Sequence, residues 1–196
     1  MHCLERRDDM RHKKGKIQLL FALGIVALNL GTFYYCDPLH ENLSDLGNKL
    51  HHPIYMILWA TSISLYLIYY TLTLMKRKNY TNHIGKIACV ASCVGMVVAI
   101  LLPYQPVVYP VLAKWHIRFA MASTIVYALT FLHFLLDVQK KDILFFQDAF
   151  PKYLLIALFD CSFFVLNGGV STVLEVSFCI YMSLYLYYLL EISKTT

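Results

Sequence analysis

Residues 36–52 read CDPLHENLSDLGNKLHH and lie between two long runs that carry no charged residue, 17–35 and 53–75. A helix needs roughly 20 apolar residues to cross the hydrocarbon layer of a bilayer, and both runs have about that length. The stretch between them concentrates titratable side chains in an otherwise apolar sequence. The pattern therefore predicts two membrane-spanning helices joined by a polar loop, and we expect any chemical site of the protein to lie in or near that loop.

Four more apolar runs follow in the rest of the chain. Runs of this length are helices, because backbone N–H and C=O groups inside a bilayer must bond to one another, and a barrel would show shorter alternating segments. We predict an all-α, polytopic membrane bundle at 17–192, with a basic arm at 1–16 and a tail at 193–196. The six predicted spans are 17–35, 53–75, 87–104, 114–138, 153–167 and 171–192. The apolar, aromatic stretch 143–150 is expected to lie along the membrane interface.

The composition agrees with this fold class. Hydrophobic residues make up 59% of the 196 residues and charged residues only 15%, against about a quarter in soluble domains. The net charge is +5, and the basic residues gather at the ends of the apolar runs, which suits loops near anionic lipid rather than a surface for nucleic acid. Four of the six cysteines lie in apolar runs, and Cys36 has no partner on its side of the membrane, so no disulfide framework is predicted.

The distribution of lysine and arginine predicts the orientation. Fourteen of these residues fall in the N-terminal arm, the loops after the second and fourth spans, and the tail, which all lie on one side. Only Lys49, Lys114 and Arg118 lie on or near the other side. The positive-inside rule then predicts that both termini lie in the cytoplasm. The membrane is expected to be the cell (inner) membrane. Residues 36–52 and the starts of the fourth and sixth spans would face outward.

This topology brings separated polar residues to one depth at the outer face. The candidate binding residues are Asp45, His116, Arg118, Asp160 and Glu175. An ionisable residue inside a span is costly and usually faces the bundle interior beside a partner. Arg118 is the only basic residue deep enough to neutralise an acid there, so we expect it to pair with Asp160 or Glu175.

A carboxylate, an imidazole and a hydroxyl at one level suit acid–base hydrolysis or metal binding. The candidate catalytic residues are Ser44, as nucleophile, with Asp45, His116 and Glu175, and the candidate metal ligands are His52, His116 and Glu175. A purely structural reading stands beside this one. In it, Ser44 and Asp45 cap a helix or order the loop, and Arg118 and Glu175 tie helices together.

Ser44-Asp45-Leu46-Gly47 after a first span resembles the Ser-Asp-x-Gly signature of the DRAM (damage-regulated autophagy modulator) family of six-helix proteins. Uncharacterised prokaryotic membrane proteins carry a similar Leu-Ser-Asp-Leu-Gly. The similarity extends to Asn82 and Gly85 before the third span, and to His116 and Glu175 at the starts of the fourth and sixth. The chain departs from the family in having Glu41-Asn42 where Pro often precedes the signature, and Val176 where Trp often follows the Glu. The resemblance implies a six-helix membrane protein with a lipid-related role and no established catalytic residue.

Four functions fit these observations. The first is a non-enzymatic protein that binds or organises membrane lipids, as a homo-oligomer or with a partner membrane protein. The second is an intramembrane hydrolase or transferase acting on lipid headgroups. A haem-binding electron-transfer protein would use His51 or His52 with His116, but the fifth span offers no histidine for a second haem. A small transporter would need a polar path at mid-membrane, where only Asp160 lies near. The sequence assigns no cofactor.

Overall fold

In the computed structural model, the described residues are 2–194, with side chains from residue 15 onward. They form helices joined by short loops, and no strand occurs among them. The elements are α1 (His2–Gly31), the 3-10 turn η1 (Thr32–Tyr34), α2 (Leu43–Asn48), α3 (Pro53–Arg77), α4 (His83–Leu101), α5 (Pro110–Gln139), α6 (Ile143–Leu166) and α7 (Thr172–Ile192). All but η1 and α2 are long and apolar enough to cross a membrane, with α1 contributing Gly15–Tyr34 together with η1. The prediction of an all-α bundle with six membrane spans is confirmed.

The largest difference from the predicted spans concerns α6. This helix begins at Ile143, ten residues before the predicted start of the fifth span. The stretch 143–150, which was expected to lie along the interface as a separate segment, therefore forms the first turns of the helix. Pro151 lies inside α6 without ending it. The fifth span is thus a 24-residue helix and not the shortest of the six.

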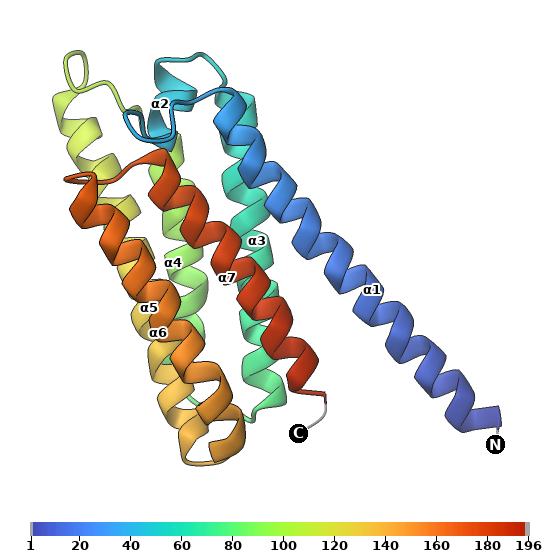
Figure 1. Cartoon of the computed structure of the whole chain (residues 1–196). Helices are drawn as coiled ribbons and strands as arrows, with labels where there is room; N and C mark the ends of the chain where they lie inside the picture. The colour runs from blue at the N-terminus through green and yellow to red at the C-terminus, as the bar shows by residue number, and fades with distance from the viewer. Residues whose placement is uncertain (1, 195–196) are drawn as a thin grey trace.

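The long helices α3 to α7 form a ring in chain order, which closes where α7 packs on α3. Helix α1 lies outside this ring and packs mainly on α7 and also on α3. Both ends of the chain lie at one end of the bundle, and α2 lies across the other end (Figure 1). This second end is called the α2 end below. An even number of spans requires the two termini to share a side, as the structure shows.

Tyrosine side chains fill much of the ring interior. Their hydroxyl groups bond to carbonyls of neighbouring helices, as in Tyr66 to Ser183 O at 2.9 Å and Tyr185 to Ala149 O at 2.8 Å. Tyr127 lies at the centre with its hydroxyl 2.8 Å from Thr71 Oγ1. A tyrosine hydroxyl without a partner in a dry interior would lose its hydrogen bonds to water and gain none in return. These contacts therefore allow the tyrosine rings to be buried without leaving their hydroxyl groups unpaired.

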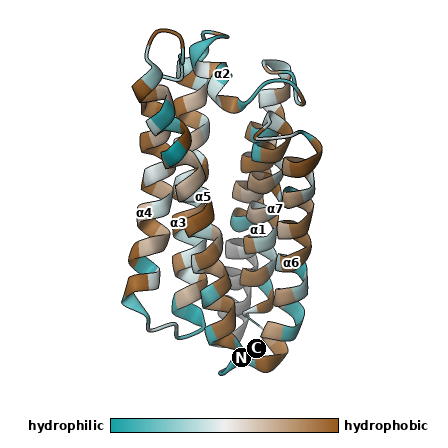
Figure 2. Cartoon of the chain, turned by 90° about the vertical axis from the view of Figure 1, so that its left-hand side faces the viewer, coloured by the Kyte–Doolittle hydropathy of each residue, from teal (hydrophilic) through white to brown (hydrophobic). Residues whose placement is uncertain are grey.

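The outward faces of the helices remain apolar. Leu155 is 68% exposed and Leu158 65% exposed on α6, and Leu65 and Tyr69 are each 62% exposed on α3. Hydrophobic residues cover most of the length of the long helices (Figure 2). Apolar surface of this extent on every span is expected where lipid replaces water as the surrounding solvent.

Candidate functional site

The short helix α2 forms because its sequence supplies its own cap. The side chain of Asn42 accepts a hydrogen bond from Asp45 N, and the side chain of Asp45 accepts one from Asn42 N, which is the reciprocal arrangement of a capping box. Leu43 and Leu46 are buried on the side of α2 that faces the bundle. A six-residue helix has little stability alone, so α2 depends on these caps and on its contacts with the long helices.

Helix α7 is joined to the loop and to α2 by its first turn. Glu175 Oε2 accepts a hydrogen bond from Leu43 N at 2.8 Å, and so satisfies the first backbone donor of α2. In return, Thr172 N donates to Glu41 O at 2.8 Å and Val173 N donates to Pro38 O at 2.9 Å. The free N–H groups at the start of α7 thus find carbonyl acceptors in the loop.

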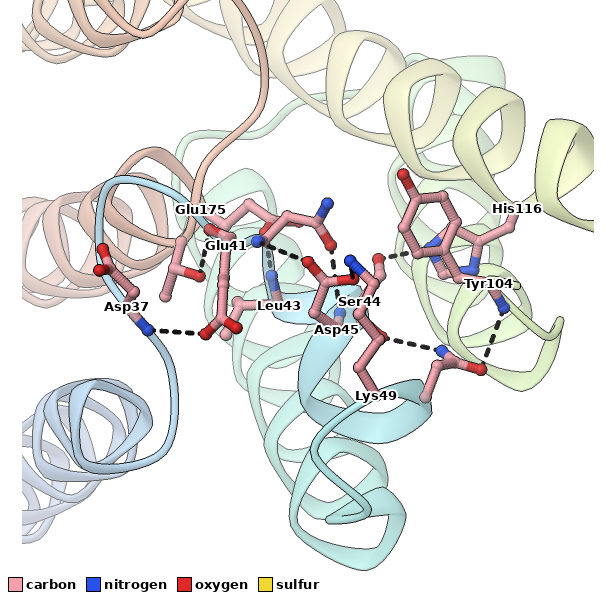
Figure 3. A network of polar contacts seen from close by, with 12 residues as sticks. Asp37, Glu41, Leu43, Ser44, Asp45, Lys49, Tyr104, His116 and Glu175 are labelled. Carbon is pink, nitrogen blue, oxygen red and sulfur yellow. Dashed lines mark hydrogen bonds and ion pairs between the residues drawn. The ribbon is translucent and has the colours of Figure 1, made fainter. Parts of the chain in front are cut away.

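Helix α5 reaches α2 through His116, which is buried. Its Nε2 lies 2.5 Å from Ser44 Oγ, and its Nδ1 lies 3.0 Å from Leu102 O. A carbonyl only accepts, so Nδ1 carries the proton in the neutral ring, and Nε2 accepts the hydrogen of the Ser44 hydroxyl. Tyr104 packs on the imidazole with ring centroids 5.2 Å apart. His116 and Glu175 approach α2 from opposite sides (Figure 3).

The other residues of α2 also hold this helix in place against its neighbours. Asp45, only 3% exposed, forms an ion pair of 2.8 Å with Lys49 one turn later. Asn48 Nδ2 donates to Ser44 O, and Asn48 Oδ1 accepts from Tyr104 N at 3.1 Å. At Gly47, a Cβ atom would lie 2.5 Å from Met56 Sδ, so the absence of a side chain lets α3 pack closely on α2. Each member of the Ser-Asp-x-Gly tetrapeptide therefore has a defined contact.

Titratable groups of the loop respond to this packing. Burial raises the pKa of the Cys36 thiol to about 11, and the nearby Glu41 and Asp45 carboxylates act in the same direction. The Leu39 and His40 backbone N–H groups lower the pKa of the exposed Asp37, which they hydrogen-bond. The hydrogen bond to Asp45 raises the pKa of Lys49. Cys36 is therefore a neutral thiol at physiological pH and no nucleophile.

The structure brings Ser44, Asp45, His116 and Glu175 to α2, but not to one common point. His116 contacts the Ser44 hydroxyl, Glu175 contacts backbone, and Asp45 contacts Asn42 and Lys49. His52 packs against Tyr35 with ring centroids 4.5 Å apart and the rings tilted by 47°, and it forms no metal-binding group with the other two candidate ligands. Within residues 15–194, no three His, Cys, Asp or Glu side chains are placed to hold a metal ion.

The predicted pairing of Arg118 is wrong. Arg118 is exposed on the outer side of α5, with its guanidinium 5.4 Å from the ring centre of Trp115. Asp160 instead accepts a hydrogen bond from Ser177 Oγ at 3.1 Å, and its Oδ2 has no hydrogen-bond partner among the described residues. His116 is buried and Arg118 lies two residues later, about 200° around the helix, so the two cannot face the same interior.

Sequence reasoning missed Asn42, Asn48 and the Leu102 carbonyl. The spacing of Asn42 and Asp45 is that of a capping box, so the sequence did contain a signal for the start of α2. No local pattern identifies Asn48 as the link to Tyr104, because that contact depends on how the α4–α5 loop folds over α2. The same holds for the choice of Leu102 O as the acceptor for His116.

Comparison with known proteins adds no assignment. No protein-family model, no curated protein sequence and no solved structure matches this chain. The resemblance to the DRAM family therefore rests on the residues quoted above.

Two kinds of chemistry are available at the α2 end. The carboxylates of Asp45 and Glu175 already serve as capping groups and in an ion pair, which is a structural use. The Ser44–His116 contact differs, because a hydroxyl that donates to an oriented imidazole is the arrangement that activates a serine nucleophile. Ser44 is only partly buried.

Proposed function

We propose that the protein is a non-enzymatic, lipid-binding membrane protein in which α2 and the residues that hold it form a rigid polar platform at one end of the bundle. The observation that supports this proposal most is the use of Asp45 and Glu175. Both carboxylates cap or brace α2 through defined contacts, Asp45 with Asn42 and Lys49 and Glu175 with Leu43 N. A layer built in this way fixes the ends of α3, α5 and α7 relative to one another at the level where lipid headgroups begin.

The resemblance to the DRAM family supports the same proposal. In this chain the signature residues Ser44, Asp45 and Gly47, together with His116 and Glu175, build the contacts of α2. If these residues serve to hold α2 in place, their side-chain types are explained by structural contacts, and no catalysed reaction is needed to explain them. We further propose that the terminal end is cytoplasmic in a cell membrane, and that the apolar outer faces contact lipid or a second membrane protein.

Mass spectrometry of co-purified lipid tests this proposal. We would compare the wild-type protein with His116→Ala, which removes the link between α5 and α2, and with His83→Ala at an exposed position. The wild type and His83→Ala should retain the same bound lipids, and His116→Ala should lose part of them. Equal lipid content in all three proteins would contradict a role for the platform.

A second function is favoured by one specific observation, the 2.5 Å contact between Ser44 and His116. In a serine hydrolase, Ser44 Oγ would attack the carbonyl carbon of a lipid ester while Nε2 accepted the hydroxyl proton. The same nitrogen would then return that proton to the departing alcohol, and water would release the acyl group from the serine. Leu102 O would hold the ring, a place that a carboxylate occupies in the usual triad.

An activity-based probe separates the two functions. A fluorophosphonate labels only a serine that an adjacent base activates, so a hydrolase would show labelling of Ser44 that is lost in His116→Gln. The platform proposal expects no labelling of Ser44 in the wild type. Peptide mapping of the labelled protein identifies the site, and Ser44→Ala provides the blank.

A further inference from the structure

Two cationic side chains lie on the lipid-facing side of α5 near the α2 end. Lys114 and Arg118 are both exposed and stand four residues apart, which places them on one helical face. The Arg118 guanidinium lies over the ring of Trp115, which is itself 47% exposed. No carboxylate of residues 15–194 forms an ion pair with either cation.

The length of α5 indicates the depth of these two residues. Residues 119–136 contain no charged residue and lie between Arg118 and Asp137. At ~1.5 Å per residue these 18 residues span ~27 Å, close to the ~30 Å of the hydrocarbon layer. Arg118 therefore stands at the boundary of the hydrocarbon. Lys114 stands one turn, ~6 Å, further out, where the phosphate groups of a lipid leaflet lie.

Apolar side chains continue the same face toward the membrane centre. Met121, Ile125 and Leu129 are 41%, 53% and 58% exposed. At 100° per residue, these three lie within about 60° of the Lys114 and Arg118 directions. The face thus has a cationic end at headgroup depth and an apolar strip below it, in the order in which a phospholipid has its phosphate and its acyl chain.

Electrostatics favours a ligand with a net negative charge. A cation at the edge of the hydrocarbon is costly unless an anion or water compensates it, and each Lys or Arg near a bilayer attracts anionic lipid by about 1 kcal/mol. The phosphate of a zwitterionic lipid already has a cation within its own headgroup. Two adjacent side-chain cations therefore fit an anionic headgroup better.

We propose that Lys114 and Arg118 bind the phosphate of an anionic phospholipid whose acyl chain lies along Met121, Ile125 and Leu129. This inference rests on the proposed lipid-binding function and gives it a lipid class and a place on the molecule. In this proposal the partner of Arg118 is a lipid phosphate, whereas the sequence analysis expected a carboxylate inside the bundle.

The test uses the full chain in detergent with added phosphatidylglycerol, phosphatidylcholine or inorganic phosphate. Native mass spectrometry measures the bound lipid, and thermal unfolding measures its stabilising effect. The double variant Lys114→Gln/Arg118→Gln is matched by Lys76→Gln/Lys140→Gln, which removes two exposed charges at the opposite end. The first should bind phosphatidylglycerol on the order of tenfold to thirtyfold more weakly than the wild type, and the second should bind it equally well.

Three results would overturn the inference. The two double variants could lose binding equally, phosphatidylcholine could bind as well as phosphatidylglycerol, or inorganic phosphate could stabilise the protein as much as the lipid does. Selective binding of phosphatidylcholine would reject this site while leaving a lipid-binding function in place. Labelling of Ser44 by a fluorophosphonate would reject the non-enzymatic proposal without affecting the lipid site, so the two failures are distinguishable.

Discussion

At the residue scale, His116 is the side chain on which the α2 end depends most. Its two ring nitrogens contact two different segments, Ser44 in α2 and Leu102 at the end of α4. Because the Leu102 carbonyl can only accept, the proton position on the ring is fixed by structure, and so is the direction of the Ser44 hydroxyl. A single residue thereby joins three elements.

Replacing His116 should consequently cost more than replacing its partner. In His116→Ala, the partly buried Leu102 carbonyl loses its donor and the ring contact with Tyr104 disappears, so we expect the free energy of unfolding to fall by about 2–3 kcal/mol. Ser44→Ala removes one hydrogen bond and should cost about 1 kcal/mol. Unfolding by SDS titration in mixed micelles measures both changes. His83→Ala, at an exposed position, should remain at the wild-type value, and a loss there as large as in His116→Ala would contradict the argument.

Glu175 offers a matched pair of variants. Its role in the structure is to accept a hydrogen bond from Leu43 N, and this needs an oxygen but no charge. Glu175→Gln keeps that oxygen and should stay within about 0.5 kcal/mol of the wild type, whereas Glu175→Ala should lose about 1–2 kcal/mol. The same SDS titration measures both. A loss in Glu175→Gln as large as that in Glu175→Ala would show that the negative charge itself is required.

The sequence contained more information on single residues than the predictions used. His116 and Arg118 lie two positions apart in one helix, so one of them had to face lipid if the other faced the interior. The expected pairing of Arg118 with Asp160 or Glu175 failed for this reason. The contact of Glu175 with backbone could not have been predicted, because it depends on the three-dimensional path of residues 37–43.

At the element scale, α6 shows how a proline is accommodated inside a span. Pro151 has no N–H and its ring disturbs the carbonyls of the preceding turn. Donors from other residues lie around that turn, since Tyr185 donates to Ala149 O at 2.8 Å and Lys152 Nζ donates to Asp148 O at 2.9 Å. Proline is tolerated in membrane helices where neighbouring groups supply such bonds.

Removing one of these donors should weaken the packing of α6 on α7. Tyr185→Phe keeps the buried ring but deletes the hydroxyl, and should lower the free energy of unfolding by about 1 kcal/mol. The control is Tyr181→Phe on the same helix, whose hydroxyl forms no hydrogen bond with residues 15–194, and it should change stability by less than about 0.5 kcal/mol. Thermal unfolding in detergent measures both. If Tyr185→Phe and Tyr181→Phe change stability equally, the hydrogen bond from Tyr185 to Ala149 O does not stabilise the helix near Pro151.

The elements themselves were predictable to different degrees. The existence and type of the six spans followed from apolar runs, because a bilayer allows few other structures for such runs. The predicted start of α6 was wrong because a proline followed by a lysine, Pro151-Lys152, is typical of the end of a membrane span. The hydrogen bonds that allow both residues to lie inside the helix cannot be read from the sequence. Helix α2 was expected only as a loop, although Asn42 and Asp45 have the spacing of a cap.

At the scale of the whole molecule, charge is distributed unequally between the two ends. The terminal end holds the α3–α4 and α5–α6 turns (Figure 1). Lys76, Arg77, Lys78, Lys86, Lys140 and Lys141 lie in these turns or at the helix ends beside them, and Lys152 lies further along, inside α6. The α2 end holds only Lys49, Lys114 and Arg118. Translocation disfavours short loops rich in lysine and arginine, so the terminal end should be cytoplasmic. The fold shows that the termini share a side (Figure 1).

Cysteine labelling of intact cells with a membrane-impermeant maleimide tests this orientation. Val107→Cys places a thiol in the α4–α5 loop, where the native side chain is 94% exposed, and Lys140→Cys places one in the loop before α6. We expect Val107→Cys to react and Lys140→Cys to react only after the cells are opened.

The native cysteines should leave this experiment nearly free of background on the outer side. Maleimide reacts with the thiolate, and a thiol with a pKa of about 11, such as Cys36, is ionised on the order of one part in ten thousand at pH 7. Cys36 is also buried, and Cys161, the exposed cysteine of α6, faces lipid where a charged reagent does not enter. Reaction of the parent chain should therefore be slow at pH 7 and should rise as the pH approaches the pKa of Cys36, whereas Val107→Cys should react at once. If Lys140→Cys reacts in intact cells and Val107→Cys does not, the α2 end is cytoplasmic, and the polar platform and the Lys114–Arg118 face meet the inner leaflet.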